Sequence, residues 1–295
     1  MDSYNRRTFL SECGLVVFSL ALIPFSREMN ALRVRKHSKK GIGLRIQPNN
    51  DWGKKLESLN VSWHYSWGLK PKEKERYPGN VQFVPMVWGS NDIENVAEYL
   101  KEQRKLGKID SLLGFNEPDH KKQSNITVEK ALELWPILMK IDARLGSPAC
   151  INPYNEWMKT FMQQADERKL RIDFITIHHY GGPNPKALIN KCKQVYEMYG
   201  RPIWITEFAV GDFQMKDTKK HKYSSQRVLK FMQGVLPELD KLDLVERYAW
   251  FPAKKNNKHL STSALFNEDG KLTTLGRYYA DYRACCKRRS KIVPL

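Results

Sequence analysis

From about residue 40 onward, short apolar segments rich in β-branched and aromatic residues alternate with longer amphipathic segments. The short segments predict strands and the amphipathic ones predict helices, so the chain consists of repeated strand–helix units. Such repetition is typical of a parallel sheet covered by helices. We predict eight strands, at residues 41–45, 61–67, 81–88, 112–116, 145–149, 174–180, 203–208 and 247–251.

The segments between these strands have the lengths of ordinary helices. We predict helices at residues 51–59, 91–106, 128–144, 154–169, 185–199 and 224–242, and a closing helix at about 275–288. No low-complexity segment divides the chain after residue 40. Eight such units in roughly 255 residues have the size of a (β/α)8 TIM barrel, in which functional groups gather at the C-terminal ends of the strands.

Composition narrows the class of protein further. Of the 295 residues, 41% are hydrophobic and 28% are charged, which excludes disordered, coiled-coil and collagen-like proteins. The net charge is +18, but the basic residues are spread over several segments without a recognition helix, zinc finger or RNA-binding aromatic motif. We therefore expect no nucleic-acid partner and interpret the charge as a solvated basic surface.

The N-terminal segment resembles a targeting signal. Arg6 and Arg7 precede an apolar run of twelve residues at 14–25, shorter than the roughly 20 residues of a membrane-spanning helix. This pattern predicts an export signal of the twin-arginine type and no stable membrane insertion beyond it. Retention as an uncleaved anchor stays open. We expect a periplasmic or extracellular monomer with a signal at residues 1–31, a basic linker at 32–40, a barrel at 41–289 and a tail at 290–295.

Five cysteines occur in the chain, and their spacing does not select a disulfide pattern. Cys13 lies in the signal, which leaves Cys150, Cys192, Cys285 and Cys286, for which three pairings are open. No Cys-x-x-Cys or His-Glu-x-x-His motif is present, so we predict no metal site. Buried thiols are the default interpretation.

Two glutamates occupy strand ends where a carboxylate is poorly solvated. Glu117 follows the fourth strand and Glu207 lies near the end of the seventh. Strands four and seven lie on opposite sides of an eight-stranded barrel, so the two carboxylates would face each other across its mouth. Such a pair can flank a glycosidic bond, one as general acid and the other as nucleophile.

The strand ends also carry side chains suited to binding and supporting a sugar. The Tyr180 hydroxyl on strand six can donate to a carboxylate on strand seven, and Asn116 can bond a sugar hydroxyl. His178 and His179 point to opposite faces, and we expect His178 to face inward because it shares its face with Tyr180. Aromatic rings can stack on the C–H face of a pyranose. The candidate aromatic residues are Trp63, Tyr65, Trp67, Trp88 and Trp250.

These motifs resemble glycoside hydrolase family 128 over residues 41–283. The resemblance implies a retaining endo-β-1,3-glucanase that needs no cofactor, on a (β/α)8 barrel with its acids on strands four and seven. It implies Glu117 as acid/base and Glu207 as nucleophile, with Asn116, His178 and Tyr180 as supports. The segments that carry the resemblance are 62–68, 83–89, 114–119, 178–181, 204–209, 247–251 and 264–276.

Two features depart from what the resemblance implies. His64 and His179 stand where the family commonly has aromatic residues, and a neutral glucan does not account for the charge of +18. Two alternatives therefore stay open: a non-catalytic carbohydrate-binding barrel, and a basic surface protein that binds an acidic polysaccharide. Binding to an acidic polymer would weaken steeply with salt, whereas stacking on a neutral glucan would not.

Overall fold

The computed structural model describes residues 38–45, 51–70, 77–215 and 221–283. The predicted export signal, most of the predicted linker, the C-terminal tail and Cys13, Cys285 and Cys286 lie outside these ranges. Cys150 and Cys192 are both buried free thiols. Within the described ranges, every helix is too short or too polar to span a bilayer.

All eight predicted strands are present, although the third, fourth and fifth are only two residues long. Pro85 and Pro148 follow closely after two of them and lack the backbone N–H that would extend the pairing. The strands are β1 (Lys40–Gly43), β2 (Trp63–Tyr65), β3 (Gln82–Phe83), β4 (Ser111–Leu112), β5 (Arg144–Leu145), β6 (Ile175–Gly181), β7 (Ile203–Val210) and β8 (Val245–Trp250).

The predicted helices are also present, and five of them begin at a residue whose side chain accepts a backbone N–H. Thr127 caps α3 in this way and Ser224 caps α6. The prediction for α3 extended to residue 144 and was too long, because the helix ends at Met139. The helices are α1 (Trp52–Leu59), α2 (Ile93–Lys105), α3 (Val128–Met139), α4 (Glu156–Glu167), α5 (Pro185–Tyr199), α6 (Ser225–Lys241) and α7 (Thr274–Asp281), with a short 3₁₀ turn η1 (Ser261–Ser263).

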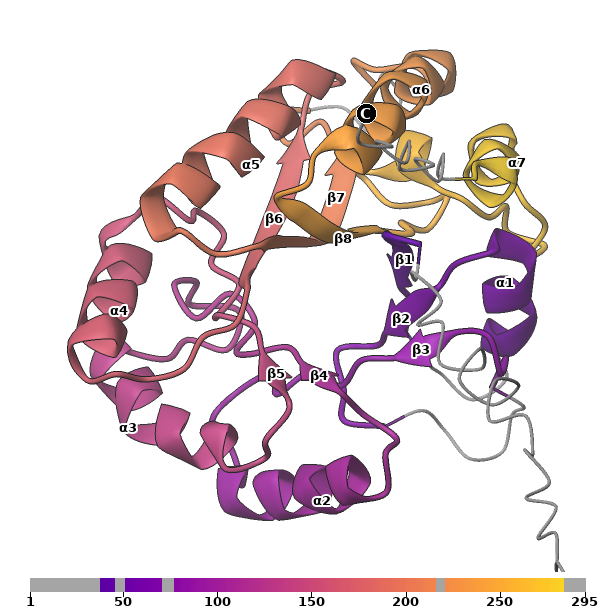
Figure 1. Cartoon of the computed structure of the whole chain (residues 1–295). Helices are drawn as coiled ribbons and strands as arrows, with labels where there is room; N and C mark the ends of the chain where they lie inside the picture. Colours follow the sequence, from indigo (N-terminus) through magenta and orange to yellow (C-terminus); the bar gives the residue numbers. More distant parts are fainter. Residues whose placement is uncertain (1–37, 46–50, 71–76, 216–220, 284–295) are drawn as a thin grey trace, which may run out of the picture. The chain divides into compact units, whose positions relative to one another are not determined.

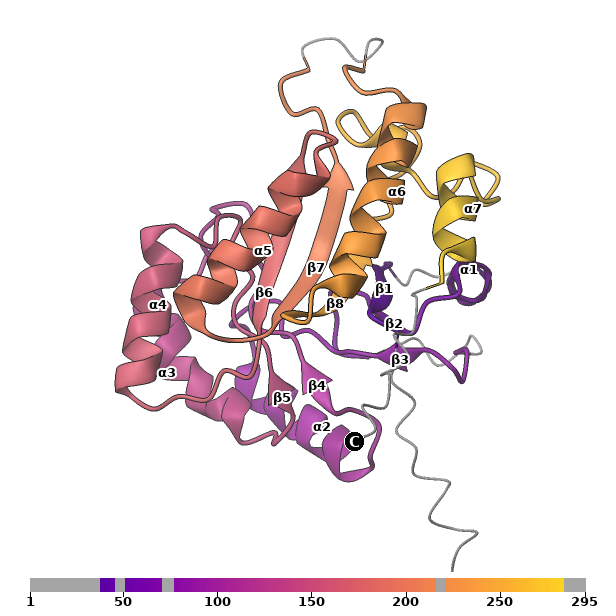
Figure 2. The same cartoon turned by 45° about the horizontal axis from the view of Figure 1, so that its top comes forward.

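The strands are parallel and fall into two sheets. The larger sheet has the order β3-β2-β1-β8-β7-β6, and β4 pairs with β5 in a second sheet. Backbone hydrogen bonds link the two, from Leu113 N to Pro85 O (2.9 Å) and from Ser147 N to Phe174 O (2.9 Å). The fold is therefore a mixed α/β architecture of parallel strands, with the helices on the outside (Figure 1 and Figure 2).

Two hydrophobic clusters hold this arrangement together. The larger one lies between strands and helices, and a smaller one lies on the opposite side of the strands and includes Trp63, Tyr65 and Trp204. A Cβ atom on Gly41 would lie 2.2 Å from the Trp63 ring, and one on Gly43 would lie 2.8 Å from Tyr65. The first strand is weakly apolar because these two rings fill the space beside it.

Two lysines that we assigned to the basic linker belong to the folded part. The Lys39 ammonium donates to three carbonyls at the end of α6, and the Lys40 ammonium donates to three at the end of α7. A cation is favourable at a helix C-terminus, where carbonyls lack intrahelical partners. The folded part therefore begins before the predicted boundary at residue 41.

Candidate active site

A bulge in β7 determines where Glu207 points. Ile203 and Ile205 pack in the cluster that contacts the helices, whereas Trp204 packs in the smaller cluster on the other side. Strict alternation would then turn Glu207 toward the helices. The pairing of β6 with β7 shifts between Ile177 and His178, so His178 lies opposite Glu207 and Thr206 is the extra residue. The bulge thus brings Glu207 to the side that Trp204 occupies.

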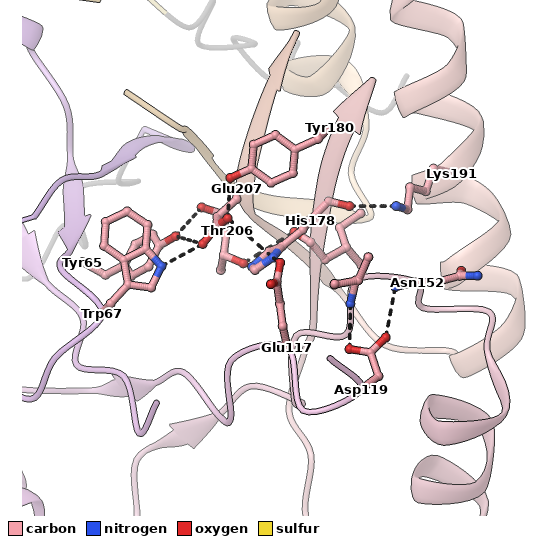
Figure 3. A network of polar contacts seen from close by, with 12 residues as sticks. Tyr65, Trp67, Glu117, Asp119, Asn152, His178, Tyr180, Lys191, Thr206 and Glu207 are labelled. Atoms are coloured by element: carbon pink, nitrogen blue, oxygen red, sulfur yellow. Dashed lines mark hydrogen bonds and ion pairs between the residues drawn. The ribbon is translucent and has the colours of Figure 1, made fainter. Parts of the chain in front are cut away.

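Three donors hold the Glu207 carboxylate (Figure 3). Its Oε1 accepts from Trp67 Nε1 at 2.8 Å and from the Tyr65 hydroxyl at 3.2 Å. Its Oε2 accepts from the Tyr180 hydroxyl at 2.5 Å, which is the hydrogen bond predicted between strands six and seven. Donors on both oxygens stabilise the negative charge of this buried group.

Glu117 lies across from Glu207 and is held by His178. The distance from His178 Nδ1 is 2.8 Å to Glu117 Oε1 and 3.6 Å to Glu207 Oε2. His178 is buried and faces the site, as predicted from its alternation with His179. The imidazole therefore lies between the two carboxylates (Figure 3).

Glu117 has a left-handed backbone conformation, with a φ of 43°. Trp67 also has a positive φ of 57°. Such conformations cost of order 1–3 kcal/mol in residues with bulky side chains and cluster at functional sites. Among the described residues other than Gly, Asn and Asp, positive φ occurs only at these two and at Lys169.

The tyrosines and the histidine of the site have shifted pKa values. Burial, followed by the charge of Glu207, raises the pKa of Tyr65 and Tyr180 well above its usual value, so both phenols remain donors. Burial lowers the pKa of His178, but the charges of Glu207 and Glu117 outweigh burial, and the net pKa is raised. Both carboxylates thus favour the protonated imidazole between them.

Asp119 fixes the loop that carries Glu117. Its Oδ1 accepts from Ile151 N at 3.0 Å and its Oδ2 accepts from Asn155 Nδ2 at 2.8 Å, which ties the loop after β4 to the start of α4. Glu117 N donates to Ala149 O at 2.9 Å. Asp119 is not among the predicted site residues, although it stands two residues after Glu117 in the same motif.

An open cleft of about 1380 Å³ lies over the carboxylates. Trp88 has 39% of its surface exposed at the cleft. Phe251, which is not among the predicted site residues, lies between Trp67 and Tyr180 at ring distances of 5.8 and 5.5 Å. The site residues that line the cleft are Trp67, Trp88, Asn116, Glu117, Tyr180, Glu207 and Phe251.

Three predicted aromatic residues do not reach this cleft. Trp63 and Trp250 are 1% and 0% exposed, so the prediction that they stack on sugar is wrong. The Trp63 indole N–H donates to Lys39 O, and that of Trp250 donates to Ser263 O. Both residues lie within their strands rather than beyond the strand ends. Tyr65 is also fully buried, and its contact with Glu207 makes it a support.

The two histidines that depart from the family pattern, His64 and His179, are not among the residues that line the cleft. His64 Nε2 is 2.8 Å from Leu44 O, and Nδ1 is 3.0 Å from the Tyr77 hydroxyl. Burial lowers the pKa of His64 to about 4. Burial, followed by the charge of Lys191, lowers the pKa of His179 to about 4. Neither histidine lines the cleft, so neither replaces a stacking surface there.

One oxygen of Glu117, one of Glu207 and a ring nitrogen of His178 all lie within 4.8 Å of one another. A cluster of this kind can hold a cation in principle. Here His178 Nδ1 is bonded to Glu117, and three donors already point at the oxygens of Glu207. These hydrogen bonds use the lone pairs that a metal would need. The arrangement therefore suits two hydrogen-bonded carboxylates better than a site for a resident metal.

The sequence matches the family described as the glycosyl hydrolase catalytic core over residues 41–279. It is 28% identical over 250 residues to the alkali-sensitive linkage protein 1 of Schizosaccharomyces pombe. That match covers 80% of this chain but only 44% of the yeast protein, so the chain spans less than half of this relative's length.

Solved structures of similar proteins each match 82% of this chain. A family 128 subgroup I endo-β-1,3-glucanase variant of Amycolatopsis mediterranei, in complex with laminarihexaose, is 31% identical with a TM-score of 0.71. The match covers 82% of this chain and 98% of that one. A subgroup II endo-β-1,3-glucanase of Sorangium cellulosum is 26% identical with a TM-score of 0.67, over 82% of this chain and 98% of that one.

Proposed function

Since this chain belongs to glycoside hydrolase family 128, the family of the glycosyl hydrolase catalytic core, we propose that it is a retaining endo-β-1,3-glucanase. The observation that carries this proposal is the pair of carboxylates on the floor of the open cleft. Glu207 has donors on both oxygens, and Glu117 lies across from it. The substrate class comes from the family 128 glucanases that the chain resembles.

We propose a closed (β/α)8 barrel with catalytic glutamates on strands four and seven. The hydrogen bonds that link β3 to β4 and β5 to β6 support closure, since the remaining neighbouring strands pair within the two sheets. Glu117 follows β4 and Glu207 lies in β7. In a barrel, the C-terminal ends of β4 and β7 lie on the same face, which is the face where active sites are built.

In the first step, a Glu207 oxygen attacks the anomeric carbon while Glu117 donates a proton to the departing glycosidic oxygen. In the second step, Glu117 takes a proton from a water molecule whose oxygen attacks the same carbon, which frees Glu207. Retaining enzymes hold the two carboxyl groups about 5–5.5 Å apart. One oxygen of Glu117 and one of Glu207 lie within 4.8 Å of each other, which agrees with a separation of this size.

The surrounding residues support this assignment of roles. Tyr180, Tyr65 and Trp67 orient Glu207 and stabilise its charge, which suits a nucleophile. The side-chain oxygen of Asn116 is buried and has no hydrogen-bond partner among the described residues. It can therefore accept a hydrogen bond from a sugar hydroxyl. We also propose that the protein is an exported monomer, as the N-terminal pattern predicts.

Azide rescue tests the two roles separately. Glu117→Ala and Glu207→Gly should each lose several orders of magnitude in kcat/KM on laminarihexaose while remaining folded. With an activated aryl β-laminaribioside, azide should attack the glycosyl-enzyme of Glu117→Ala and give a β-azide. In Glu207→Gly it should take the place of the nucleophile and give an α-azide.

Other results would overturn the proposal. If the two variants give the opposite azide anomers, Glu117 is the nucleophile and Glu207 is the acid/base. Full activity in either variant would remove that glutamate from the mechanism. A wild-type protein that binds laminarihexaose without cleaving it would be a carbohydrate-binding barrel instead.

A further inference from the structure

One part of the cleft wall is strongly cationic. Arg45, which follows β1, and Lys55, on α1, line it together with Lys254 and Lys255, which follow β8. Apart from the two catalytic glutamates, Glu268 is the single acidic residue among the described residues that line the cleft. We call these four basic residues the cationic wall.

Two charges of the cationic wall, those of Lys254 and Lys255, are accessible to a ligand. Lys254 and Lys255 are exposed, and neither forms an ion pair with a carboxylate of the described residues. The Lys55 ammonium lies 5.5 Å from the centroid of the Phe266 ring, which lines the same cleft. Lys254 lies three residues after Phe251 in the sequence. Phe251 in turn contacts Trp67 and Tyr180 beside the carboxylates. The cationic wall is therefore continuous with the catalytic centre.

An uncharged glucan does not explain this composition. Its hydroxyls can be bound by amides and phenols, and its apolar faces by aromatic rings. The exposed ammonium groups of Lys254 and Lys255 in an open cleft instead create a local positive potential, which attracts anions over roughly the Debye length of 10 Å. The charge is useful if the bound polymer itself carries anionic groups.

We propose that the preferred substrate is an acidic β-glucan, with anionic substituents on the sugar units that bind along the cationic wall. The inference rests on the proposed function for the glucan backbone and adds the charge of its substituents. It differs from general attraction by the net charge of +18, because it assigns the effect to residues inside the cleft.

The test compares laminarin with laminarin oxidised at C6, which converts some primary hydroxyls to carboxylates on an unchanged backbone. The variant is Lys254→Gln/Lys255→Gln. The matched control is Lys230→Gln/Lys258→Gln, which removes two exposed charges that do not line the cleft. Both kcat/KM and Kd are measured for each glucan at low and high salt.

We expect the wild-type protein to prefer oxidised laminarin by roughly five- to tenfold at low salt, as a few exposed charge pairs would give. High salt should reduce this ratio. The ratio should fall toward one in Lys254→Gln/Lys255→Gln and persist in the control.

Equal kcat/KM and Kd for the two glucans in the wild-type protein would overturn the inference, and hydrolysis of both would leave the proposed function intact. An equal fall of the ratio in both double variants would also overturn it, because net charge would then be the cause. A third outcome separates the two proposals: neither glucan is cleaved, but oxidised laminarin binds in a salt-sensitive manner that depends on Lys254 and Lys255. In that case the proposed glucanase function is wrong, whereas the binding of an acidic glucan along the cationic wall is retained.

Discussion

Replacement of Tyr180 by Phe should damage catalysis more than replacement of Tyr65 by Phe. Tyr180 supplies the hydrogen bond to Glu207 Oε2, whose other close neighbour, His178 Nδ1, is 3.6 Å away. Tyr65 shares Oε1 with Trp67, which donates at the shorter distance of 2.8 Å against 3.2 Å. Loss of Tyr65 therefore leaves that oxygen bonded, whereas loss of Tyr180 leaves Oε2 without a close donor.

The size of the difference follows from the energies of such bonds. A hydrogen bond to a charged group contributes about 1.5–3 kcal/mol, so Tyr180→Phe should lower kcat/KM by roughly 10- to 150-fold. A partly redundant donor contributes about 0.5–1.5 kcal/mol, so Tyr65→Phe should lose roughly tenfold or less.

The assay is the initial rate of laminarihexaose hydrolysis, with thermal unfolding measured for each variant. Tyr65→Phe should lower the melting temperature, because the Tyr65 hydroxyl also donates to the buried carbonyl of Thr206 at 3.0 Å. Equal losses of kcat/KM, or a larger loss in Tyr65→Phe, would refute the argument that Oε2 depends on Tyr180.

Two further predictions concern the cleft and the core. Trp88→Ala should weaken laminarihexaose binding by about 1–3 kcal/mol, measured by calorimetry, because the exposed ring offers a stacking face. If the variant unfolds instead, Trp88 is a core residue and the stacking role is wrong. His64 has a pKa of about 4 in the folded protein and about 6.5 when unfolded, so its contribution to stability is present above pH 6.5 and is lost as the pH falls toward 4. By about pH 5 this loss should be about 2 kcal/mol in urea unfolding, and His64→Gln should show a correspondingly smaller pH dependence.

The fold could be predicted from sequence because its signals are local. Amphipathic and β-branched segments alternate along the chain, and every predicted strand and helix has a counterpart in the structure. Among the helices, the ends differ most for α3 and α7, whose predicted helices reach residues 144 and 288 but end at Met139 and Asp281. Strand lengths could not be predicted in the same way. The segments around β3 and β5 are as apolar as the others, but their pairing is interrupted near Pro85 and Pro148.

The candidate carboxylates could be located along the chain, but their orientation could not be derived. Alternation from Ile203 and Ile205 would have turned Glu207 toward the helices, and only the bulge at Thr206 brings it beside His178. A bulge depends on how two strands pair, and no residue type in β7 announces it. The prediction that Glu207 faces the site rested on the similarity of its motif to a known family, because the strand period alone would turn it toward the helices.

The tryptophans show which part of a strand end can meet a substrate. Trp63 and Trp250 lie within β2 and β8, where ladder pairing directs each ring into one of the two hydrophobic clusters. Trp67 and Trp88 follow the last paired residues of β2 and β3, and both line the cleft. Trp67 lies two residues past the end of β2 and Trp88 lies five residues past the end of β3, so neither ring has to follow its strand's alternation. At Trp67 the positive φ turns the indole back toward Glu207. Position beyond the strand end therefore separates the core tryptophans from those at the cleft, and composition near the strand end does not.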